Sequence, residues 1–142
     1  MGQREHIAFI FAHIAFFVVF VWFGLLKMVG LSPATELVHH LFSATFLPHL
    51  LSFDSFIVLF GAFEVLIGIL FILPKTEKIA LVLLVPHMFT TVLPLFLVPN
   101  DTWNDLFQPT IEGQYIIKNI VLIALAVAVF ADLGKRYSRA SK

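Results

Sequence analysis

The sequence predicts an all-α membrane protein, a four-helix transmembrane bundle with a short extracytoplasmic interfacial helix between spans one and two. Of its 142 residues, 60% are hydrophobic and only 13% are charged, and the mean hydropathy is +0.98. A soluble domain has about 25% charged residues, so this chain has too little charge for a water-facing surface. Nine basic residues balance nine acidic ones, which excludes a nucleic-acid binder because such proteins carry a surplus of cations.

Four stretches are apolar over about the 20 residues that a spanning helix requires. They cover residues 7–29, 56–73, 79–98 and 112–131. The first is too long for the apolar region of a signal peptide and no small-residue cleavage site follows it, so we expect it to be a mature span. Nothing suggests a second domain, and residues 1–142 are predicted to form a single integral membrane domain.

The link between the first two spans is long enough for one more helix. Ser32 can cap a helix whose first residue is Pro33, with Glu36 in its first turn. Glu36 and His40 make a further full span unfavourable. We therefore expect a short helix that lies at the membrane interface and ends near Pro48.

Ionisable side chains inside the spans are the candidate functional residues, because each costs several kcal/mol in lipid unless it is paired or reaches water. At helical spacing Glu64 shares a face with Gly61 and Gly68, and small residues there allow close helix contact. We expect Glu64, His87 and Lys118 to face one another inside the bundle. The predicted ligand-binding residues are Lys27, Glu64, His87, Thr91, Glu112, Tyr115, Lys118 and Asn119.

Simpler roles for these side chains remain open. Two buried ion pairs can serve only to fix the register of the helices. Lys27, near the outer end of its span, can extend to the lipid headgroups. His87 can bond to a carbonyl that Pro86 leaves free.

The histidines raise two further alternatives, a haem and a metal site. A haem held by His13 and His87 is disfavoured because the two residues agree only loosely in depth. His39, His40 and His49 lie in the outer link, where three histidines can bind zinc or copper. Their spacing matches no strong metal signature, so no metal site is predicted and the question stays open.

Three motifs resemble a known family. The run Pro109–Asn119 (PTIEGQYIIKN) resembles the opening of the last span in YkgB/RclC-type inner-membrane proteins of the DoxX-like superfamily. Trp22–Lys27 (WFGLLK) and Gly61–Gly68 (GAFEVLIG) resemble the family's first two spans. Asn119 departs from the pattern, which has an acidic residue after the lysine in many members. The resemblance implies a four-helix protein of the bacterial inner membrane, linked to oxidative or chlorine stress or to quinone-linked redox complexes.

Three functions are consistent with these features. The first is a redox- or stress-associated subunit whose polar intramembrane pocket binds a quinone headgroup or another small ligand. The second is a structural subunit, without chemistry of its own, that docks onto a larger membrane complex. The third is a small transporter or proton path, which four spans would form only as a homo-oligomer. Whether the chain is an enzyme is left open.

Charge predicts the orientation of the four spans, with both termini cytoplasmic. Seven of the nine Lys and Arg residues fall on the side that holds the termini and the turn at Lys75. On the opposite side, the loops between the spans contain Asp and Glu but no Lys or Arg. Positive residues favour the cytoplasm. Reporter fusions at both termini should therefore give a cytoplasmic signal, and an extracytoplasmic signal at either terminus would contradict this prediction.

Overall fold

The computed structural model is mainly helical and describes the backbone of residues 3–140 and the side chains of residues 6–134. Its helices are α1 (Gln3–Met28), α2 (Thr35–Ser43), η1 (Leu47–His49), α3 (Phe53–Ile72), α4 (Glu77–Val92), α5 (Pro94–Leu97), α6 (Pro99–Thr102), α7 (Ile111–Lys118) and α8 (Ile120–Ala140). A small antiparallel hairpin, β1 (Trp103–Asp105) and β2 (Gln108–Pro109), precedes α7.

Four segments of the described chain are long and apolar enough to cross a membrane. They are His6–Met28, Phe53–Ile72, Glu77–Leu97 and Ile111–Gly134, and each predicted span lies within three residues of one of them at both ends. The four-helix, all-α fold is thus confirmed, and the chain is an integral membrane protein. The last two segments are interrupted: Pro94 follows the end of α4, and a turn at Asn119 separates α7 from α8.

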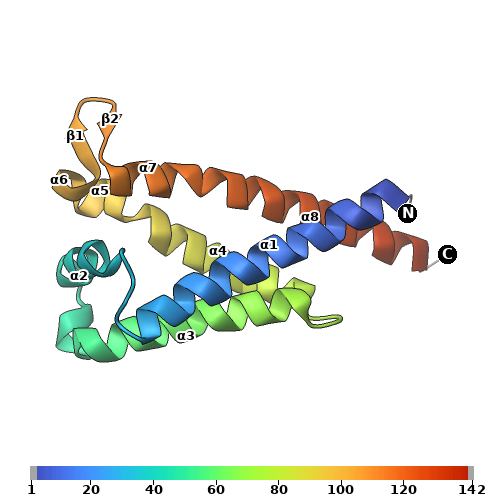
Figure 1. Ribbon diagram of the computed structural model, residues 1–142, viewed down its shortest axis with the longest axis horizontal. Coiled ribbons are helices and arrows are strands. Elements are labelled where there is room, and N and C mark those ends of the chain that lie inside the picture. The colour runs from blue at the N-terminus through green and yellow to red at the C-terminus, as the bar shows by residue number, and fades with distance from the viewer. Residues whose placement is uncertain (1–2, 141–142) are drawn as a thin grey trace.

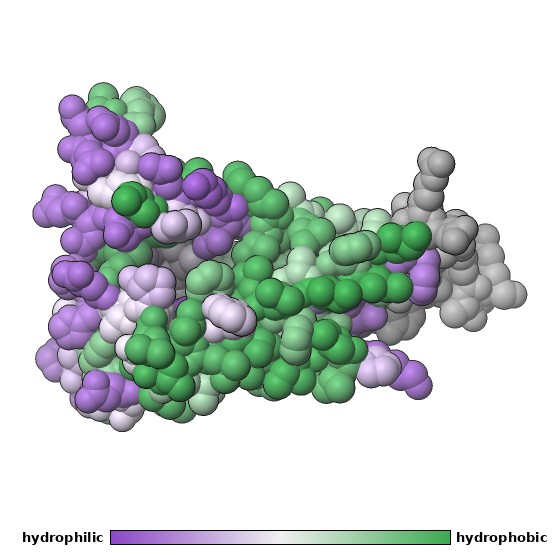
Figure 2. All heavy atoms as spheres, viewed as in Figure 1, coloured by the Kyte–Doolittle hydropathy of each residue, from purple (hydrophilic) through white to green (hydrophobic). Residues whose placement is uncertain are grey.

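The first residues of α1 and the last of α8 lie at one end of the bundle, and α2, α5, α6 and the hairpin gather at the other (Figure 1). We call this second end the distal end. Hydrophilic residues concentrate there, whereas hydrophobic residues cover the middle of the visible face (Figure 2). This distribution fits helices whose middle lies in lipid.

The short helix in the first link exists, but it starts later than predicted and ends earlier, at Ser43 rather than near Pro48. Helix α2 begins at Thr35, and its cap residue Ala34 has no side-chain cap bond. Ser32 instead closes the preceding turn, because its hydroxyl accepts from the Ala34 N–H at 3.3 Å and its carbonyl accepts from Thr35. Nine residues rise about 13 Å, too little to span. That α2 lies at the membrane interface remains a prediction.

Among the described helices, α1 and α3 make the most extensive contact, which includes a close approach through facing glycines. A Cβ atom built on Gly24 would lie 2.6 Å from the Gly61 carbonyl oxygen, and one built on Gly61 would lie 2.6 Å from the Gly24 carbonyl oxygen. A Cβ atom built on Gly68 would lie 2.8 Å from the Val21 side chain and 3.1 Å from the Val21 backbone nitrogen. Small residues permit such backbone approach between membrane helices, and in Figure 1 α1 crosses α3 at the distal half.

The core continues from this contact toward the terminal end. Phe16 stacks on Phe71, with ring centroids 4.1 Å apart and planes inclined by 9°. Ile67, Ala80 and Leu84 are buried beside them. This cluster packs α1, α3 and α4 together. It lies between the polar residues of the distal half and the terminal end of the bundle.

Replacing either facing glycine should destabilise the bundle. In Gly61→Ala the added methyl meets backbone and cannot be accommodated by a rotamer change, so we expect a loss of about 1–3 kcal/mol. Gly134→Ala is the matched control on α8, because no described atom lies within 4 Å of its would-be Cβ; it should be neutral or stabilising by up to about 1 kcal/mol. Denaturation of the variants in detergent micelles measures both, and equal effects would contradict the close contact.

Candidate functional site

A cavity of about 750 Å³ occupies the distal half of the bundle. Helices α1, α2, α3, α4 and α7 all contribute to its wall. Its apolar lining includes Phe42, Phe56 and Phe60, and its volume falls in the range of small-molecule sites, about 300–1,000 Å³. We call it the distal cavity.

All eight of the predicted ligand-binding residues line the distal cavity. Lys27, Glu64 and His87 are buried, with 6%, 5% and 5% of their surfaces exposed. Thr91 and Asn119 are half-buried, and the remaining three lie exposed along α7: Glu112, Tyr115 and Lys118. The cavity therefore has charged and polar groups both in its interior and on the α7 side.

A buried ion pair between α1 and α3 forms the interior of the site. Lys27 Nζ donates to Glu64 Oε2 at 2.6 Å. The facing glycines explain this pairing, because Gly24 lies one turn before Lys27 and Gly61 one turn before Glu64, and their contact brings both side chains together. Lys27 thus does not extend to the headgroups, and that alternative is wrong.

His87 on α4 approaches the other oxygen of the same carboxylate. Its Nε2 lies 3.5 Å from Glu64 Oε1 and 3.5 Å from the Thr91 hydroxyl. The ring stacks on Phe60 at 5.3 Å between centroids and meets Phe20 edge-on at 5.1 Å. Its Nδ1 is buried without a hydrogen-bond partner among the described residues. Since a neutral imidazole has one donor and one acceptor nitrogen, the side chain keeps unused hydrogen-bonding capacity.

The threonines beside His87 serve the backbone as well as the cavity. Thr90 and Thr91 both donate to the His87 carbonyl oxygen, at 2.8 and 2.9 Å. Such bonds to the preceding turn bend helices, and they lie just before the interruption at Pro94. From the sequence, Thr91 was predicted only to contact a ligand. In the structure its hydroxyl also donates to the His87 carbonyl oxygen.

Lys118 differs from the prediction that it faces Glu64. Its ammonium lies 5.5 Å from the centroid of the Tyr115 ring, and it makes no ion pair within 4.0 Å in the described part of the chain. The side chain is exposed. Lys27 takes the place beside Glu64, because α7 lies across the cavity from α3 whereas α1 touches α3 directly.

The loop before α7 is held by hydrogen bonds and a close backbone contact. Two residues of the Pro109–Asn119 motif, Thr110 and Gly113, take part in them. Thr110 caps α7, accepting from the Gly113 N–H at 3.1 Å, and its hydroxyl donates to the Asp101 carbonyl at 2.8 Å. Gly113 lies against the Thr102 carbonyl oxygen, where any Cβ would collide. This contact fixes the start of α7 and with it the positions of Glu112 and Tyr115.

Three of the other histidines, His13, His39 and His40, have partners outside the distal cavity. His40 Nδ1 lies 2.8 Å from Asp101 Oδ2 and connects α2 to α6. His39 meets the Phe53 ring edge-on. His13 contacts the Phe9 carbonyl at 2.8 Å, and its Nε2 lies 3.7 Å from Glu77. Within residues 6–134, no three metal-ligating side chains converge on a common point.

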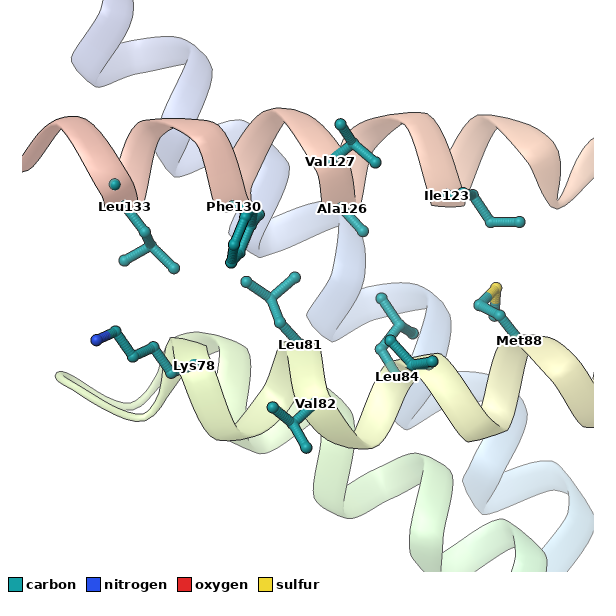
Figure 3. Close-up of a pocket in the computed structure, with 12 residues that line it drawn as sticks. Lys78, Leu81, Val82, Leu84, Met88, Ile123, Ala126, Val127, Phe130 and Leu133 are labelled. Atoms are coloured by element: carbon teal, nitrogen blue, oxygen red, sulfur yellow. The ribbon is translucent and has the colours of Figure 1, made fainter.

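A second cavity, of about 740 Å³, lies between α4 and α8. Figure 3 shows apolar side chains facing each other across it, such as Leu81 and Phe130, with Lys78 at one end. It lacks the internal carboxylate and imidazole of the distal cavity. Of these two cavities, only the distal cavity is lined by a carboxylate and an imidazole.

Comparisons with protein-family models, with curated proteins and with solved structures find no match to this chain. The resemblance to the DoxX-like superfamily therefore remains a hypothesis based on the three motifs.

Removing one partner of the buried pair should cost more than removing both. Lys27→Met or Glu64→Gln each leaves an uncompensated polar group, and breaking a buried pair typically costs about 3–5 kcal/mol. The double variant should recover at least about 1 kcal/mol of the summed loss. Unfolding in detergent provides the double-mutant cycle.

The matched control pairs Glu64→Gln with Lys118→Met, whose effects should add within about 0.5 kcal/mol. Additive losses for the Lys27 cycle, or strong coupling in the Lys118 cycle, would contradict the geometry.

Proposed function

We propose that this chain is a small DoxX-like subunit of the bacterial inner membrane, associated with redox or stress chemistry, that binds a quinone-like ligand in the distal cavity. The observation that carries the proposal is the cavity itself, which is lined by a buried His87 whose Nε2 lies 3.5 Å from Glu64 Oε1 and whose Nδ1 has no hydrogen-bond partner among the described residues. Intramembrane ionisable residues of this kind are functional candidates by default.

A quinone suits the chemistry of the cavity. Its flat ring matches a lining of phenylalanine rings, and its carbonyl oxygens need hydrogen-bond donors. His87 lines the cavity and its unpartnered Nδ1 can donate when it carries a proton, and Lys118 and Tyr115 offer donors on α7. Lys27 is already bonded to Glu64, so we assign ligand binding first to His87 and Lys118.

Proton exchange would fall to the same interior groups. Reduction of a quinone to the hydroquinone takes up protons as well as electrons, and imidazole and carboxylate are the usual side chains for such transfer. His87 Nε2 and Glu64 Oε1 lie 3.5 Å apart, close enough to relay a proton with a small rotation of either side chain. The electrons would come from a partner protein, in keeping with a role as a subunit.

The competing role is structural, and one observation favours it. Lys27 Nζ and Glu64 Oε2 are 2.6 Å apart and both side chains are buried, as expected of an ion pair that only fixes helix register. On this view the chain docks onto a larger membrane complex without binding a ligand. The two functions differ in whether the cavity binds a quinone.

Binding of a short-chain ubiquinone to the purified protein in detergent tests the proposal. His87→Leu and Lys118→Met should each weaken binding about tenfold, the effect of losing roughly one hydrogen bond to the ligand. Lys118 is exposed, so its variant carries little risk to folding. Phe130→Leu alters only the second cavity and should bind as the unmodified protein does.

Absence of binding by the unmodified protein would refute the ligand role. Unchanged binding in both His87→Leu and Lys118→Met would show that the quinone only partitions into the micelle, and it would also refute the ligand role.

A further inference from the structure

The hairpin between α6 and α7 presents the two most exposed large apolar side chains of the described residues. Leu106 is 84% exposed and Phe107 is 87% exposed, and they occupy the tip between β1 and β2. Figure 1 shows the hairpin projecting sideways from the distal end of the bundle, and Figure 2 shows a hydrophobic tip above hydrophilic residues. Neither side chain is among the residues that line the distal cavity.

The hairpin is built to hold this tip outward. At its base, the Trp103 indole N–H donates to the Leu95 carbonyl at 3.1 Å. At the tip, Asp105 Oδ1 accepts from the Leu106 N–H at 2.7 Å, and Phe107 has φ +62°. A bulky residue rarely adopts a positive φ. The hydrogen bonds at the base and tip, together with the positive φ of Phe107, define one conformation of the hairpin. In this conformation the Leu106 and Phe107 side chains point outward.

The depth of the tip can be estimated from the last span. Ile111–Gly134 has 24 residues and rises about 36 Å, whereas the hydrocarbon core is about 30 Å thick. Ile111 therefore lies at, or a few ångströms beyond, the distal boundary of the hydrocarbon. The hairpin ends at Pro109 and runs across the bundle axis (Figure 1), so a bilayer placed at this boundary would meet the tip.

We propose that Leu106 and Phe107 form an interfacial anchor that inserts into the lipid leaflet at the distal end. Interfacial segments bury Phe and Leu side chains at the boundary between headgroups and acyl chains, and their binding strengthens with the buried apolar area. The neighbouring Asn104 and Gln108 are exposed and can remain among the headgroups. A tip rising into water would instead suit a protein partner, but the sideways course of the hairpin favours lipid.

The absence of cysteine from the sequence permits a direct test by site-directed spin labelling. Single variants Phe107→Cys and Leu106→Cys are labelled and reconstituted in phosphatidylcholine vesicles. Collision rates with oxygen, which concentrates in lipid, and with a water-soluble nickel chelate report the depth of each label. Asn104→Cys on the same hairpin is the water-facing control, and Val85→Cys, exposed on α4, is the lipid-facing reference.

If the tip inserts into lipid, labels at positions 106 and 107 should resemble the label at position 85 in their high collision rate with oxygen. Their collision rate with the nickel chelate should be lower than at position 104. Nickel accessibility equal to that at position 104 would place the tip in water and overturn the proposal. Protection from both reagents would show that a second copy of the chain covers the tip, which would also overturn it. None of these outcomes depends on whether the distal cavity binds a quinone.

Discussion

The close contact between α1 and α3 is the constraint on which the rest of the structure depends. Gly24 and Gly61 bring the two backbones together, and one turn later Lys27 and Glu64 meet inside the bundle at 2.6 Å. In a bilayer neither charge can be left alone without a cost of several kcal/mol. Packing and electrostatics thus select one rotation and one register of α1 against α3.

The distal cavity follows from how the other helices end. Helix α4 stops before Pro94 and the last span is interrupted at Asn119, so neither continues straight along the α1–α3 pair. In Figure 1 the α7 end of the last span lies apart from α1 and α3, and α2 lies at the distal end between them. The apolar side of α2, with Leu37, Leu41 and Phe42, lines the resulting space.

Hydropathy and helical spacing predicted the spans and the faces of the polar residues, because both depend on local sequence. They could not predict which cation meets Glu64. Lys27 and Lys118 are each on an inward face by spacing, but only the glycine contact across helices decides that α1 is nearer to α3 than α7 is. The hairpin was missed for a related reason. Its turn contains Leu106 and Phe107 rather than glycine or asparagine, and is held by contacts with α5 and α6.

The two oxygens of Glu64 separate the structural role of the site from its proposed chemistry. Oε2 is bonded to Lys27 and holds α1 to α3, whereas Oε1 faces His87 at 3.5 Å. A ligand bonded to His87 could therefore exchange a proton with Oε1 while the bond to Oε2 keeps the helices in register. A carboxylate suits this arrangement because it has about four acceptor positions on two oxygens. On this proposal Lys27 positions Glu64, and the proton exchange would be confined to the side of the carboxylate that faces α4.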